Sequence, residues 1–167
     1  NYYIHHIGAL REIWPDADFI HLVRDGRDVA CSYIDLQQLD SDSPYRPDLP
    51  TDIEAIAKEW VNNNKRIEAA LTDIPFRVIQ IRYEDLILDK IRTLTKILDF
   101  LGLKWSDTMQ DHAVKHDEPS TTMAWKKRTK GPFDPSRAGR FKEQLNRNQL
   151  TLFDAIAGDM LRHYNYL

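Results

Sequence analysis

The stretch FIHLVRDGRDVACS, residues 19–32, decides the fold of this chain. Its first five residues, Phe19 to Val23, form a run that is apolar apart from His21, which is typical of a strand buried on both faces of a parallel sheet. The run ends at Arg24, and apolar residues at helical spacing follow from about Asp28 to Leu36. A buried strand that leads directly into a helix is the first part of an α/β unit.

The same alternation of strand and helix continues along the chain. Residues 53–71 carry apolar side chains at helical spacing, and Thr51 and Glu54 have the Thr-x-x-Glu form of a capping box. Residues 76–81 form a second apolar strand, which is again followed by an arginine, Arg82. Both strands are therefore expected to be inner strands of one parallel sheet.

Further helices are predicted before and after these strands. Their patterns cover residues 4–14, 91–101 and 148–164. Gly102 is expected to end the second of these helices. Polar, proline-containing segments at residues 40–50 and 117–139 are expected to be loops. This order of elements favours a single α/β domain over the whole chain, with a central parallel sheet flanked by helices.

The composition is that of an ordinary globular protein. The 167 residues are 42% hydrophobic and 29% charged, and a formal net charge of −3 argues against nucleic acid as a partner. The only cysteine, Cys31, is expected to fill the core, and a single cysteine fits a reducing, cytoplasmic location. No stretch approaches the roughly 18 apolar residues of a membrane span, so no membrane segment is expected in this chain.

The arginine at the end of the first strand raises the possibility of an anion site. Ligands of parallel α/β proteins bind beyond the carboxyl ends of the strands, where helix N-termini also point. Arg24 together with the hydroxyl of Ser32 and the amides of the helix start would favour a phosphate. The alternative is that Arg24, Asp25, Arg27 and Asp28 form an ordinary solvated charge cluster with a helix cap.

Three longer segments carry a resemblance to a known family. They read ALREIWPDADFIHLVRDGRDVACSY (9–33), IRYEDLILDKIRTLTKILDFLGLKW (81–105) and RAGRFKEQLNRNQLTLFDAIAGDMLRHYNY (137–166). In this order they resemble the sulfotransferases, including the bacterial and protein-tyrosine branches. The resemblance implies a P-loop-NTPase-like layered fold and the donor 3′-phosphoadenosine 5′-phosphosulfate (PAPS), with no metal.

The resemblance also assigns roles to particular residues. It implies that Arg24 and Ser32 bind the 3′-phosphate of the donor and that Tyr83 contacts its adenosine part. Gly139, Arg140 and Phe141 match an element that helps to cover the nucleotide. The implied reaction transfers the sulfuryl group to an acceptor hydroxyl or amine on a small molecule, sugar, lipid or peptide.

Two elements of the family pattern are missing from this sequence. It has no phosphate loop similar to Pro-Lys-Ser-Gly-Thr-Thr, and no Lys-Thr-His or Glu-Lys-Thr-Pro segment. The strand, loop and helix that hold the 5′-phosphosulfate, and the catalytic base, are therefore expected ahead of Asn1. On this interpretation the chain is the carboxyl-terminal portion of the domain and is inactive alone. A non-catalytic nucleotide-binding module or degenerate fragment is the main alternative, and a P-loop kinase-like protein is a weaker one.

Other polar groups have simpler explanations. His112 and His116 have the spacing of two metal ligands on a helix, but a solvated helix face is favoured because no third ligand is evident. Glu84 and Asp85 are expected to cap a helix or form a local ion pair. The cationic residues 126–130 fit a nucleotide lid and a solvated loop equally well.

Overall fold

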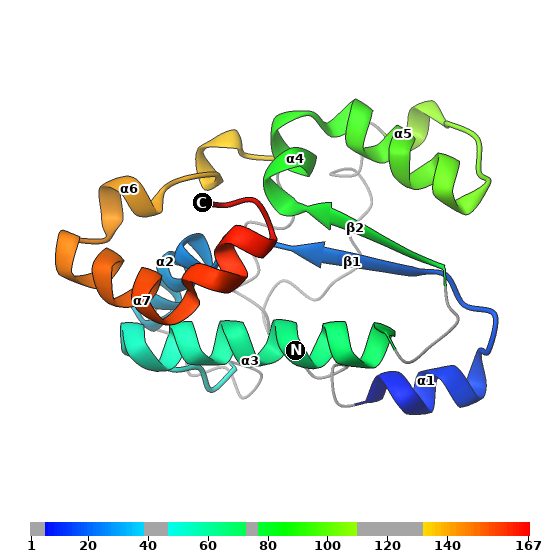
Figure 1. Cartoon of the computed structure of the whole chain (residues 1–167). Coiled ribbons are helices and arrows are strands. Elements are labelled where there is room, and N and C mark those ends of the chain that lie inside the picture. The colour runs from blue at the N-terminus through cyan, green and yellow to red at the C-terminus, as the bar shows by residue number, and fades with distance from the viewer. Residues whose placement is uncertain (1–5, 39–46, 73–76, 110–131) are drawn as a thin grey trace.

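The computed structural model describes residues 6–38, 47–72, 77–109 and 132–167. It is an α/β structure in which two parallel strands, β1 (Phe19–Val23) and β2 (Val78–Arg82), are flanked by helices (Figure 1). The α-helices are α1 (Ile7–Ile13), α2 (Gly26–Gln37), α3 (Ile53–Thr72), α4 (Tyr83–Leu88), α5 (Lys90–Leu101), α6 (Phe141–Gln144) and α7 (Arg147–His163). Two short 3₁₀ helices are η2 (Asp107–Met109) and η5 (Pro135–Arg137). The predicted fold class is confirmed.

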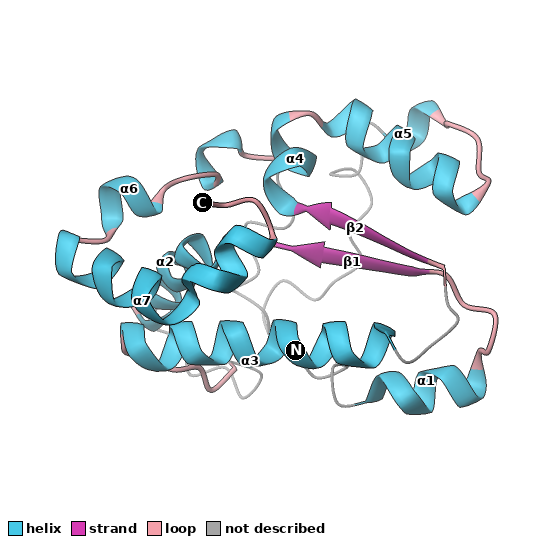
Figure 2. Cartoon of the chain, in the orientation of Figure 1, coloured by secondary structure: helices cyan, strands magenta, loops and turns pink. Residues whose placement is uncertain are grey.

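The two strands pair in parallel, as predicted, with Val23 opposite Arg82. The bounds of β1 agree with the prediction, whereas β2 begins only at Val78, so that Arg77 lies outside it, and extends one residue further than expected because Arg82 still pairs with β1. Phe76, which was expected in the strand, lies outside the described residues. Figure 2 shows that both strands point toward the side of the molecule where α2, α4 and α6 lie.

The burial of the strands differs from the prediction. Residues paired across parallel strands point to the same face, so Ile20 and Leu22 share a face with Ile79 and Ile81. Ile79 and Ile81 are buried on β2, which α4 and α5 contact, but Ile20 and Leu22 are 44% and 50% exposed. On the other face, Val23 joins the core formed with α3 and α7. On β2, Val78 and Gln80 of that same face are exposed. The expectation that both faces are buried is therefore wrong for both strands, because the described helices leave part of each face uncovered.

Two predicted helices begin at slightly different positions from those expected. α2 starts at Gly26 instead of about Asp28, because the Asp25 carboxylate caps it by accepting from the amide of Arg27 at 2.9 Å. α3 starts at Ile53, and the Asp52 carboxylate accepts from the amide of Ala55 at 2.8 Å. The cap of α3 is therefore Asp52, one residue after the predicted Thr51.

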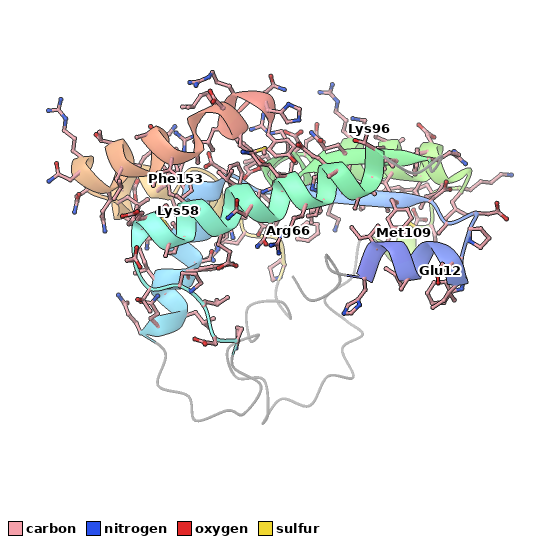
Figure 3. All side chains as sticks on the ribbon, turned by 60° about the horizontal axis from the view of Figure 1, so that its bottom comes forward. Glu12, Lys58, Arg66, Lys96, Met109 and Phe153 are labelled. Atoms are coloured by element: carbon pink, nitrogen blue, oxygen red, sulfur yellow. The ribbon has the colours of Figure 1, made fainter. Side chains whose placement is uncertain are left out.

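The core lies where α2, α3 and α7 meet. Trp60 of α3 packs against Phe153 of α7 with ring centroids 6.3 Å apart, and Figure 3 shows Phe153 on the helix next to α3. Gly26 allows this packing, since a Cβ there would lie 2.6 Å from Trp60 and 2.8 Å from Phe153. Cys31 is buried, as predicted, and burial raises the pKa of its thiol to about 11. By residue type, Asp25 and Gly26 permit a tight turn into the helix, but the structure requires Gly26 for close helix packing.

The remaining helices agree with their patterns. Gly102 ends α5 in the left-handed conformation, with φ of +67°. Asn146 and Gln149 form a capping box at the start of α7. The apolar residues of this helix that its pattern places inward are buried or partly buried: Leu150, Phe153, Ile156, Ala157, Met160 and Leu161. The first helix is seen from Ile7, and residues 1–5 lie outside the described part. Among the described residues, no helix is long and apolar enough to span a membrane.

Candidate anion-binding site

Arg24 is the first residue after β1, and its side chain joins two elements that are distant in sequence. Its Nη1 atom donates to the hydroxyl of Ser32 at 2.9 Å, and its Nη2 atom donates to the carbonyl oxygen of Arg137 at 3.1 Å. The backbone carbonyl of Arg24 accepts from the indole of Trp60 at 3.1 Å, which fixes the strand end against α3. The guanidinium therefore stands at a defined place beyond the carboxyl end of the sheet.

Ser32 lies on α2, on the helix face that Arg24 contacts. Its Oγ accepts from Arg24 and also from Nη2 of Arg137 at 3.3 Å, and it donates to the carbonyl oxygen of Asp28 at 3.0 Å. Two guanidinium groups thus converge on one hydroxyl. Guanidinium and hydroxyl donors at one point can bind the oxygens of a tetrahedral anion such as phosphate.

Tyr83 is brought to the same place from the second strand. Because Val23 pairs with Arg82, the residues that follow the two strand ends, Arg24 and Tyr83, are neighbours. The guanidinium carbon of Arg24 lies 4.7 Å from the centroid of the Tyr83 ring, within the range of a cation–π contact. An aromatic ring beside an anion site is a surface on which a base or sugar can pack.

Residues 137–141 are held against α2 by a buried carboxylate. Asp28 accepts from the amide of Gly139 at 2.7 Å and from the amide of Phe141 at 3.0 Å. Gly139 has φ of +77°, a conformation that favours glycine. The segment therefore passes close to Ser32, and Gly139 lies beside the predicted site.

The side chains of Arg140 and Phe141 have protein partners of their own. Arg140 Nη2 lies 2.6 Å from a carboxylate oxygen of Asp35, and its Nε donates to Gln144 at 2.8 Å. Phe141 is buried in the core, with the guanidinium carbon of Arg27 4.1 Å from its ring centroid. The structure thus brings Arg24, Ser32 and Tyr83 together, while Arg140 and Phe141 fix the neighbouring segment to α2.

Arg137 is the residue that sequence reasoning missed. Its guanidinium reaches Ser32, and its Nη1 lies 3.7 Å from Asp35 on the next turn of α2. The signal in the sequence was weak, because Arg137 stands in a polar, proline-containing stretch with several other cations. Only the packing of the segment 137–141 against α2 distinguishes Arg137 from the other cationic residues of that stretch.

The charge-cluster alternative is right about the helix cap, but it is wrong about solvation, because Asp25, Arg27 and Asp28 are buried. Asp25 and Arg27 form a buried ion pair of 2.8 Å, and Asp25 also caps α2. Burial alone would lower the pKa of Arg27, but the hydrogen bonds and charge of Asp25 raise it overall. These two residues therefore stabilise the turn, whereas Arg24 faces the other way, toward Ser32.

Glu84 has a different role from those predicted. Its carboxylate accepts from the amide of Asp25 at 3.0 Å and from the phenol of Tyr166 at 2.7 Å, and among the described residues it neither caps α4 nor forms a local ion pair. Burial and the adjacent Glu84 carboxylate raise the pKa of Tyr166. Glu84 thereby joins the chain end to both strand ends.

Two groups of residues singled out from the sequence cannot be placed. His112, His116 and the cationic residues 126–130 lie outside the described residues. In the part of the chain that the structure describes, no three His, Cys, Asp or Glu side chains are grouped as metal ligands. A pocket of about 300 Å³ lies beside Tyr33, Leu36, residues 47–49 and Thr51, and neither Arg24 nor Ser32 lines it.

The fold and this site define a class: an α/β protein in which two guanidinium groups and a hydroxyl converge at the carboxyl end of a parallel sheet. The sulfotransferase family model matches residues 1–107, which is more than half of the sequence. The chain therefore belongs to the sulfotransferase family.

Two solved structures have the same fold. The sulfotransferase domain from the curacin biosynthetic pathway aligns with a TM-score of 0.67 and 22% identity, over 95% of this chain and 59% of that one. The sulfotransferase domain from the Synechococcus PCC 7002 olefin synthase aligns with a TM-score of 0.59 and 24% identity, over 93% of this chain and 55% of that one. This chain thus spans less than two thirds of the length of either domain.

Proposed function

We propose that the protein containing this chain is a PAPS-dependent sulfotransferase, in which this chain binds the 3′-phosphate of the donor. The observation that carries the proposal is the convergence of Arg24 and Arg137 on the Ser32 hydroxyl, with distances of 2.9 and 3.3 Å. The Tyr83 ring beside Arg24 supports contact with the adenosine part.

On this proposal the guanidinium groups exchange their bonds to Ser32 for bonds to phosphate oxygens. The Nε atom of Arg24 is buried and has no hydrogen-bond partner among the described residues, so an oxygen of the ligand would supply one. Ser32 would turn its hydroxyl from the Asp28 carbonyl toward the phosphate. The site then fixes the position of the donor at its end opposite to the sulfur.

Positioning is the contribution that we assign to this chain. In the transfer, an acceptor oxygen or nitrogen bonds to sulfur as the bond from sulfur to the 5′-phosphate oxygen breaks, and the acceptor proton passes to a base. Holding the donor in line with the acceptor lowers the entropic part of the barrier. Gly139, Arg140 and Phe141 would contribute by keeping the segment that carries Arg137 in place. The acceptor class, a hydroxyl or amine of a small molecule, sugar, lipid or peptide, stays a prediction, as does the cytoplasmic location.

Calorimetric titration of the full-length protein tests the donor site. 3′-Phosphoadenosine 5′-phosphate should bind more tightly than adenosine 5′-phosphate, and Arg24→Ala should weaken only the first by about ten- to a hundredfold. Lys58→Ala removes a cation from the exposed face of α3 and should leave both affinities unchanged. Equal losses for the two nucleotides in Arg24→Ala would mean that Arg24 is structural.

The competing function is a nucleotide-binding module without transfer activity. It predicts the same binding preference but no product from PAPS with any acceptor. Incubation of the full-length protein with labelled PAPS and a panel of phenols, sugars and amines separates the two functions.

A further inference from the structure

α2 presents three polar residues to the segment 137–141. Asp28, Ser32 and Asp35 are spaced at i, i+4 and i+7, so they share one face of the helix. Each contacts the segment: Asp28 through the amides of Gly139 and Phe141, Ser32 through Arg137, and Asp35 through Arg140 and Arg137. The proposed phosphate ligand Ser32 therefore lies between two carboxylates that bind the same segment.

Capping of α2 does not account for the position of Asp28. The helix is already capped by Asp25, which accepts from the amide of Arg27. Asp28 is fully buried, with 0% of its surface exposed, and its two carboxylate oxygens each accept from a different amide across 111 and 113 residues of sequence. Burial of a carboxylate costs its solvation free energy unless hydrogen bonds replace the bonds to water, and the two bonds from these amides do so for Asp28.

The amides that Asp28 holds lie close in sequence to the guanidinium that the anion site uses. Gly139 is two residues after Arg137, and the 3₁₀ helix η5 ends at Arg137. The carbonyl of Arg137 is fixed from the other side by Nη2 of Arg24 at 3.1 Å. The backbone around Arg137 is therefore held at two points, by Asp28 and by Arg24, and its side chain reaches Ser32 from there.

We propose that Asp28 is a positioning residue of the donor site: by binding the amides of Gly139 and Phe141, it places Arg137 at the 3′-phosphate. Asp28 itself has no contact with the anion, because it is buried and both its oxygens are used by the segment. This inference rests on the proposed function. On this inference, Asp28 contributes to the selectivity for the 3′-phosphate without contacting the phosphate.

Nucleotide titration of Asp28→Asn in the full-length protein tests the inference. The amide NH₂ of asparagine cannot accept from a backbone amide, so one of the two bonds is lost. The affinity for 3′-phosphoadenosine 5′-phosphate should fall about tenfold, while that for adenosine 5′-phosphate should change little. Asp159→Asn, which removes the same charge from an exposed site on α7, is the matched control and should change neither affinity.

A double-mutant cycle with Arg137→Ala distinguishes positioning from general damage. If Asp28 acts through Arg137, adding Asp28→Asn to Arg137→Ala should cause no further loss of 3′-phosphate selectivity. Independent, additive losses would overturn the inference. A wild-type protein without preference for the 3′-phosphate would instead refute the proposed function, so the two failures are distinguishable.

Hydrogen exchange of the wild-type protein provides a test that does not depend on a variant folding. The amides of Gly139 and Phe141 should be protected without nucleotide, because their partner is Asp28 and not the ligand. Fast exchange of both amides in the nucleotide-free protein, with protection only after nucleotide is added, would show that the ligand orders the segment and would contradict the inference.

Discussion

Replacement of Arg27 by alanine should be among the most destabilising substitutions in this chain. Arg27 and Asp25 are 6% and 4% exposed, and the guanidinium makes two hydrogen bonds of 3.0 and 2.8 Å to the Asp25 carboxylate. It also donates to the carbonyl of Tyr166 at 2.9 Å and packs on the ring of Phe141. Arg27→Ala removes all of these contacts and leaves the Asp25 carboxylate buried without its cation.

The magnitude follows from that unpaired charge. Breaking one partner of a buried ion pair costs about 3 to 5 kcal/mol, because the remaining charge has lost its solvation and its partner. Asp25 retains its hydrogen bond from the amide at position 27, which places the expected loss toward the lower part of this range. Adding Asp25→Asn to Arg27→Ala should recover part of the loss, since position 25 then carries no unpaired charge while the helix cap is preserved.

Urea denaturation of the full-length protein, followed by circular dichroism, measures the free energy of unfolding for each variant. Arg162→Ala is the matched control, because its ion pair with Asp159 is exposed, and it should have only a small fraction of the effect. A loss below about 1 kcal/mol for Arg27→Ala would contradict the reasoning, because it would place the pair in the range of a solvated surface ion pair. No recovery in the double variant would mean that the lost packing on Phe141 and Tyr166 dominates.

Three further outcomes are expected. Gly26→Ala should lower the free energy of unfolding by about 1 to 3 kcal/mol in the same assay, because the new methyl group would overlap Trp60 and Phe153, whereas Gly8→Ala has nothing within 4 Å and should not destabilise. Burial lowers the pKa of His21 below its ordinary 6.5, so the unfolded state binds more protons and the free energy of unfolding should fall as the pH drops below about 6.5. His21→Gln should flatten this pH dependence in thermal unfolding at pH 5 to 7, and an unchanged pH dependence would exclude His21 as its source. The purified 167-residue chain should give no sulfated product from labelled PAPS with phenols, sugars or amines, and turnover above background would place a catalytic base within it.

The elements of this fold were largely predictable because they depend on local patterns. The apolar run Phe19 to Val23 marked β1 to the residue, and Gly102 marked the end of α5 through its left-handed conformation. The starts of α2 and α3 were displaced by one or two residues, since several side chains near each start can accept the capping hydrogen bond. Which carboxylate does so depends on the path of the chain into the helix.

Burial was less predictable than element type. The apolar character of Ile20 and Leu22 indicated a doubly covered strand, but coverage depends on where helices pack. Similarly, Gly26 suggested a turn from its position after Asp25, while its real constraint comes from two aromatic rings on α3 and α7. Such constraints arise between residues that are far apart in sequence, so no local pattern records them.

The sequence alone determined the family, the strand that Arg24 follows and the helix face that carries Ser32, because each depends on residue type and short spacing. The tertiary structure decided which cation meets that hydroxyl. Arg137 lies 105 residues from Ser32, and it reaches the site because Asp28 binds the amides of the segment that follows it. The same docking turned Arg140 toward Asp35 and Phe141 into the core. The contact between Arg137 and Ser32 depends on how the segment 137–141 packs against α2. Neither of these two parts of the sequence specifies that packing by itself.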